Sequence, residues 1–152
     1  MMYRHWPKRD PIKNYFPLPN ELFALDLNSS EISIYAYLLR CENRETHQCW
    51  PSYKTIGKAT KLCENTVRKY VCSLEDRHLI RTEQTMITSK DGRGMNGSLC
   101  YTICPVQEAL DYYHERQLMR ADEEAARRRM EKRLERINKQ KSVNFDKEGM
   151  SA

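Results

Sequence analysis

The spacing of apolar residues predicts a central helix in the segment LNSSEISIYAYLLRCEN, residues 27–43. Residues three or four positions apart lie on one face of a helix. The apolar residues at that spacing, which are expected to face the core, are Ile32, Tyr35, Ala36 and Leu39. Neighbouring apolar residues widen this face. Ser29 or Ser30 is expected to cap the N-terminus of the helix.

Two further helices, joined by a turn of three residues, are predicted in the next segment. Ser52 is expected to cap a short helix that ends near Thr60, and Lys61–Cys63 form the turn. A second helix is expected from about Glu64 to Arg77, and its inward positions are Val67, Val71 and Leu74. Two short helices joined in this way are the DNA-reading unit of helix-turn-helix proteins.

The residue types in this unit agree with a helix-turn-helix at some positions and depart from it at others. Gly57 supplies a small residue where the two helices meet, and Leu62 supplies an apolar plug in the turn. Thr60 stands where an apolar residue is common. Lys61 occupies a position that favours a left-handed glycine, at a cost of about 1 kcal/mol. Cys63 stands where serine or threonine would cap the second helix, so that cap is expected to be weak.

A β-hairpin is predicted after the second helix. The segment LIRTEQTMIT, residues 79–88, has strand character, SKDGRGMNGS at 89–98 is expected to be a loop, and LCYTIC at 99–104 is a second strand. A hairpin at this place completes a winged helix. The predicted fold class is therefore mainly α with a small β-hairpin, a winged helix-turn-helix followed by a long charged helix.

Composition divides the chain into four parts. Only 39% of the residues are hydrophobic, whereas a compact globule usually holds about 45–50%, so part of the chain is expected to lie outside the core. Residues 1–14 are predicted to form a flexible basic arm, 15–104 the winged helix-turn-helix domain, 105–141 a charged helix, and 142–152 a disordered tail.

Charge is segregated along the chain in a way that favours a polyanion as partner. Residues 53–100 hold nine basic and five acidic residues, and residues 125–141 hold eight basic and two acidic. In a helix-turn-helix, the exposed first turns of the second helix meet base edges, and neighbouring cations meet phosphates. The candidate DNA-binding residues are Ser52, Tyr53, Lys54, Lys61, Asn65, Thr66, Arg68, Lys69, Lys90 and Arg93.

These candidates have different expected roles. The hydroxyls and backbone N–H groups at Ser52 and Tyr53 suit a phosphate. Arg68 on guanine, or Asn65 on adenine, would each give about 1–3 kcal/mol of discrimination. Lys90 and Arg93 are expected on the wing. Thr66 is the least clear of the set, because a residue at the third helical position can face inward.

The chain from Tyr15 to Ile103 resembles the winged-helix domain of replication initiators and regulators on plasmids, phages and integrative elements of Gram-positive bacteria. The matching stretches are YFPLPNELF, SSEISIYAYLL, CWPSYKTIGKA and NTVRKYVCSLEDRHLI with the hairpin after it. Such domains are similar to the N-terminal half of replication-initiation and primosome proteins. The resemblance implies double-stranded DNA as partner and a bacterial mobile genetic element as context. It does not separate replication from transcription.

Other interpretations remain beside this one. A winged helix can also serve as a protein-interaction adaptor that does not bind DNA. The C-terminal helix could supply a homodimer interface, or its run Arg127–Arg129 a second nucleic-acid contact, and replication or transcription machinery is a further possible partner. A site for a metal at Cys41, His47 and Cys49 is disfavoured, because their spacing matches no common site.

The sequence predicts neither an enzyme nor a bound cofactor or metal. The four histidines are scattered, and no phosphate-binding GxxxxGK[ST] motif is present. No apolar run approaches the roughly 18 residues of a membrane span, so no membrane partner is expected. The opening MMYRHWPKRD lacks the apolar region of a secretory signal. A cytoplasmic location with reduced thiols is therefore expected.

Overall fold

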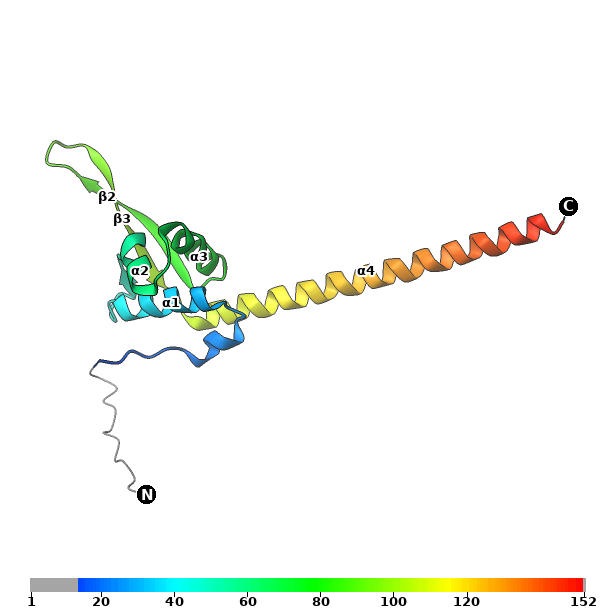
Figure 1. The fold of residues 1–152 in the computed structure, drawn as a ribbon, viewed down its shortest axis with the longest axis horizontal. Helices are drawn as coiled ribbons and strands as arrows, with labels where there is room; N and C mark the ends of the chain where they lie inside the picture. The colour runs from blue at the N-terminus through cyan, green and yellow to red at the C-terminus, as the bar shows by residue number, and fades with distance from the viewer. Residues whose placement is uncertain (1–13, 152) are drawn as a thin grey trace, which may run out of the picture. The chain divides into compact units, whose positions relative to one another are not determined.

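The computed structural model describes residues 14–151, which divide between Tyr112 and Tyr113 into two compact units (Figure 1). In chain order the elements are the 3-10 helix η1 (Asn20–Ala24), α1 (Ser29–Cys41), β1 (Gln48–Cys49), α2 (Tyr53–Thr60), α3 (Glu64–Asp76), β2 (Ile80–Thr88), β3 (Gly94–Ile103) and α4 (Val106–Gly149). Of the arm predicted at residues 1–14, only Asn14 lies among the described residues.

The first unit is a winged helix-turn-helix, as predicted. Helices α1, α2 and α3 contact one another, and an antiparallel sheet of order β1-β3-β2 packs against α1 and α3. The largest fully buried apolar side chains come from all of these layers: Leu22, Ile34, Tyr35, Leu38, Ile56, Val67, Val71, Leu74, Leu79, Ile80 and Tyr101. One core therefore fixes the position of α3 against the sheet.

Helix α1 is present where predicted, but its cap and its buried face differ from the expectation. Asn28, rather than Ser29 or Ser30, is the N-cap, and its side chain accepts a hydrogen bond from the Glu31 N–H at 2.9 Å. The residues buried on the helix are Glu31, Ile34, Tyr35 and Leu38, whereas Ile32, Ala36 and Leu39 are only half-buried. The face is rotated because it includes a carboxylate that contacts α3.

Glu31 is a charged side chain in the core, 2% exposed, and connects α1 to α3. Its Oε2 accepts from the Asn28 N–H at 2.9 Å, and its Oε1 accepts from the Ser73 hydroxyl. The Arg77 guanidinium lies 3.3 Å from the same Oε1 and also donates to the Leu25 carbonyl at 2.9 Å. Both carboxylate oxygens are thus satisfied, which a buried charge requires.

The wing is longer than predicted. Strand β3 begins at Gly94, so residues 94–98, expected in the loop, lie in the strand, where Gly94, Met95 and Asn96 pair with β2, and the connecting turn is short. The register shifts between Gln84 and Met86, and a Cβ at Gly97 would lie 2.5 Å from the Thr85 hydroxyl. Glycine is therefore part of the β-bulge rather than of a loop. The two-residue strand β1 was not predicted.

Helix α4 also exceeds its predicted bounds. Ala109 is buried, and the Tyr112 ring stacks on His78 with centroids 4.1 Å apart, so the first turns of α4 belong to the first unit. At its other end the helix continues to Gly149. The tail predicted to be disordered from residue 142 is therefore helical through residue 149. Among the described residues, no helix is long and apolar enough to cross a membrane.

Candidate nucleic-acid interface

The turn between α2 and α3 has the geometry that the sequence pattern requires. Lys61 adopts the left-handed conformation, with φ 61°, and the N–H groups of Lys61 and Leu62 both point to the Gly57 carbonyl. A Cβ at Gly57 would meet the Leu62 carbonyl oxygen at 2.5 Å. Gly57 is thus needed for the close approach of the turn, whereas the Val67 side chain would lie at an ordinary contact distance of 3.7 Å.

The two helices differ in how their N-termini are capped. Ser52 caps α2 as predicted, because its Oγ accepts from the Thr55 N–H at 3.1 Å. Cys63 occupies the N-cap of α3 but makes no side-chain hydrogen bond to the helix backbone, so the predicted weak cap is confirmed. Its Sγ instead lies 3.0 Å from the Thr66 Oγ1. Thr66 is half-buried, and its hydroxyl is engaged in this local contact.

The exposed face of α3 presents three of the predicted residues to solvent. All three are exposed: Asn65 and Lys69 lie on the side of the helix opposite the buried Val67 and Val71, and Arg68 lies at the flank of that side, next to α2. This face is the one that a recognition helix places in the major groove.

Two of these residues also contact aromatic rings. The Arg68 guanidinium carbon lies 5.5 Å from the centroid of the Tyr53 ring, and the Lys69 Nζ lies 5.4 Å from that of Tyr70. The first contact joins α2 to α3 and orients Arg68 by a cation–π interaction. Burial raises the pKa of the half-buried Tyr53 hydroxyl, so the ring stays neutral beneath the cation.

The remaining predicted cations lie outside α3, on α2, on the turn and on the wing. Lys54 is exposed in the first turn of α2, and Lys61 is exposed in the turn. Lys90 and Arg93 are exposed in the turn at the tip of the wing. The structure therefore places Arg68 with Tyr53 and Thr66 with Cys63, and it holds Lys90 and Arg93 apart from them on the hairpin.

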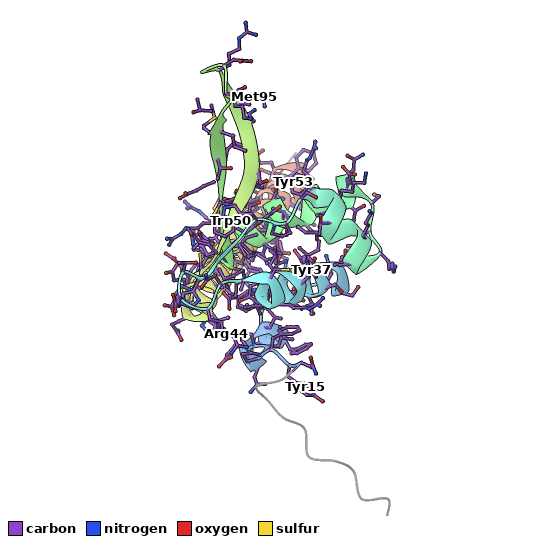
Figure 2. The ribbon with its side chains drawn as sticks, turned by 90° about the vertical axis from the view of Figure 1, so that its left-hand side faces the viewer. Tyr15, Tyr37, Arg44, Trp50, Tyr53 and Met95 are labelled. Carbon is purple, nitrogen blue, oxygen red and sulfur yellow. The ribbon has the colours of Figure 1, made fainter. Side chains whose placement is uncertain are left out.

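Sequence reasoning missed an apolar surface on the wing. Met86, Ile87 and Met95 are all more than half exposed, and Ile87 pairs with Met95 across the hairpin. Figure 2 shows Met95 on the part of the hairpin beyond the helices, with Tyr53 closer to the body. In the sequence these apolar residues stand in the stretches MIT, 86–88, and GMNG, 94–97. The pattern does not indicate a surface there, because the two glycines of GMNG are typical of a loop.

The six cysteines are free thiols in two environments. Burial raises the pKa of Cys49 to about 12, and burial also raises the pKa of Cys100 and of Cys104. Cys63 is exposed, and the hydrogen bond from the Thr66 hydroxyl lowers the pKa of its thiol. The thiolate is the reactive form of cysteine.

We expect Cys63 to be alkylated by iodoacetamide at a lower pH than an ordinary thiol, whose pKa is about 8.5. Its lowered pKa leaves more thiolate near neutrality, whereas Cys49, Cys100 and Cys104 should react only after unfolding. Mass spectrometry of samples labelled over a pH series measures this directly. Thr66→Ala removes the hydroxyl and should move the Cys63 profile to higher pH. An unchanged profile in that variant would contradict the assignment.

The histidines take structural positions. His78 follows α3 in the left-handed conformation, with φ 62°, as expected for a residue at a helix end. His47 Nδ1 lies 3.5 Å from Glu42 Oε2. In residues 14–151, no group of three or more His, Cys, Asp or Glu side chains is arranged to hold a metal ion.

Comparison with known proteins identifies the central part of this unit. Residues 25–80 match a family described as a helix-turn-helix domain. No curated protein sequence matches the chain. Among solved structures, the chain is similar to a possible transcriptional regulator from Methanosarcina mazei Go1. That similarity has 17% identity and a TM-score of 0.44, and it covers 67% of this chain and 79% of the other.

Proposed function

We propose that the protein binds double-stranded DNA through its winged helix-turn-helix unit and that its role is binding rather than catalysis. One observation carries the proposal: within a matched helix-turn-helix domain, Asn65, Arg68 and Lys69 are exposed on the face of α3 that a recognition helix presents. Arg68 and Asn65 are suited to base edges, and Lys69 to a phosphate.

The residues around α3 extend the proposed contact along a duplex. Lys54 and Lys61 are placed to neutralise phosphates beside α3. Ser52, the N-cap of α2, is exposed, so a phosphate can also approach the first turn of α2. Lys90 and Arg93 suit the backbone or a minor groove, where the apolar wing residues Met86 and Met95 would contact sugars.

The biological role that we propose is control of replication initiation or of transcription on a bacterial mobile genetic element. This rests on the resemblance of the residue 15–103 stretch to initiator and regulator domains, and replication or transcription machinery would then be a further partner. A replication origin or relaxase gene beside this gene favours the first role, and a divergent promoter favours the second.

We expect the double variant Arg68→Ala, Lys69→Ala to bind duplex DNA at least about tenfold more weakly at fixed salt. Removal of the phosphate-neutralising charge of Lys69 would also lower the slope of log affinity against log salt by about 0.9. Fluorescence anisotropy of labelled fragments from the gene's own neighbourhood, titrated at several salt concentrations, measures both quantities.

A matched control removes the same charge elsewhere. Arg40 and Arg44 are exposed, and Figure 2 shows Arg44 on the side of the body away from the wing that carries Met95. Arg40→Ala, Arg44→Ala should therefore retain the affinity. If the unmodified protein does not bind duplex DNA at low salt, the DNA-binding proposal is wrong, and the alternative of a protein-interaction adaptor is favoured.

A further inference from the structure

Helix α4 carries an apolar stripe that is exposed in the described chain. Seven of its large apolar side chains are between 39% and 78% exposed. With 100° of rotation per residue, five of these side chains and the small Ala126 fall within an arc of about 100° around the helix axis, whereas Leu118 and Val143 lie outside it. The residues of this stripe are Met119, Ala126, Met130, Leu134, Ile137 and Phe145.

The continuation of α4 to Gly149 makes this stripe longer than the sequence pattern indicated. A helix that ended at Lys141 would lose Phe145 from the stripe. Along the length of the stripe, three charges also lie within this arc: Glu123 and Lys141 share one angular position near its centre, about 20° from Met130, and Arg127 lies at its edge, at the angular position of Phe145. A charge within an apolar contact is costly unless it meets an opposite charge.

We propose that the stripe binds the stripe of a second copy of this chain, with the two helices antiparallel and centred near residue 132. In this arrangement, a residue of one copy lies opposite a residue of the other copy when their two residue numbers add up to 263 or 264. The resulting pairs between the two copies are Met119 with Phe145, Glu123 with Lys141, Ala126 with Ile137, and Met130 with Leu134.

The pairing explains the two charges nearest the centre of the stripe. Each Glu123 meets a Lys141 of the second copy, so the two charges that would be unfavourable alone become two ion pairs. A parallel pair in register would instead place Glu123 against Glu123 and Lys141 against Lys141, which is repulsive. The small Ala126 opposite the larger Ile137 also suits close packing. Charge complementarity thus selects both the partner and its direction.

The rest of the charge on α4 is compatible with this contact. Arg128 lies off the stripe and forms an i,i+4 ion pair with Glu124 at 2.6 Å. Lys132, Arg136 and Lys139 also project from the opposite side of the helix by the same geometry. The basic segment 125–141 therefore keeps most of its positive charge in solvent when two copies associate.

Charge reversal tests the proposal in the full chain by sedimentation equilibrium. The unmodified protein should associate to twice the monomer mass. Glu123→Lys and Lys141→Glu should each raise the dissociation constant by about tenfold or more, and the double reversal should restore it. Glu135→Lys makes the same charge change on the opposite side of α4 and should leave association unchanged. Circular dichroism checks that each variant remains helical.

Three outcomes would overturn the proposal. The first is a monomeric mass for the unmodified protein at every concentration, even if another protein is found to bind α4. The second is association that neither single reversal weakens, as a parallel pair would show. The third is a double reversal that fails to restore association. The measurement contains no DNA, so its result is independent of the proposed DNA binding.

Discussion

Replacement of Glu31 by alanine is expected to lower the free energy of unfolding by about 3 kcal/mol. The change removes the acceptor for the Asn28 N–H, the Ser73 hydroxyl and the Arg77 guanidinium. The Arg77 side chain is 32% exposed and can recover some hydration, so the loss should lie at the lower end for a broken buried ion pair. Urea unfolding followed by circular dichroism measures it.

Two further variants test whether the loss of stability comes from the hydrogen bonds and the ion pair of Glu31 rather than from the removal of a side chain alone. Glu31→Gln keeps the volume but not the charge, and it should fall between the wild type and Glu31→Ala. Glu21→Ala removes an exposed carboxylate from η1 and should change stability by no more than about 0.5 kcal/mol. If Glu31→Ala is as stable as Glu21→Ala, the contact between α1 and α3 does not depend on this carboxylate.

Substitution of Gly57 by alanine should destabilise the first unit by about 2 kcal/mol. Alanine favours a helix by up to about 1 kcal/mol over glycine, but here its Cβ would lie 2.5 Å from the Leu62 carbonyl oxygen. That oxygen belongs to the backbone of the turn, so α2 and α3 must move apart. Thermal unfolding should report the loss, and duplex DNA affinity should fall because α3 is displaced.

Gly94→Ala is the matched control for this substitution. A Cβ at Gly94 meets only the end of the Met86 side chain within 4 Å, at 3.5 Å, which is an ordinary contact. This variant should keep its melting temperature. If Gly57→Ala melts at the wild-type temperature, as Gly94→Ala is expected to, the turn does not require glycine at position 57.

The helices of the first unit could be predicted because their signals are local. The bounds of α2 and α3 follow from Ser52, the left-handed Lys61 and the spacing of Val67, Val71 and Leu74, all within a short stretch. The exposed face of α3 follows from the same spacing. The roles of Asn65, Arg68 and Lys69 on DNA stay predictions, since they depend on a partner outside the chain.

The features that were missed depend on residues distant in sequence. Glu31 has the composition of a surface residue, and only its contacts with Ser73 and Arg77 explain its burial. Strand β1 is too short to show a period, and it exists because it pairs with Thr102 and Tyr101. The glycine-rich stretch was assigned to a loop because glycine usually marks turns, whereas Gly97 faces a bulge across the hairpin.

The outer part of the wing has a consequence for how such a protein can change over generations. No residue from Met86 to Asn96 is buried, and the bulge before Met86 separates this part from the sheet that packs on α3. Substitutions there remove no core contact, so folding imposes little selection on them. Descendants of this chain can therefore acquire new wing surfaces one residue at a time, while the body that holds the recognition helix stays the same.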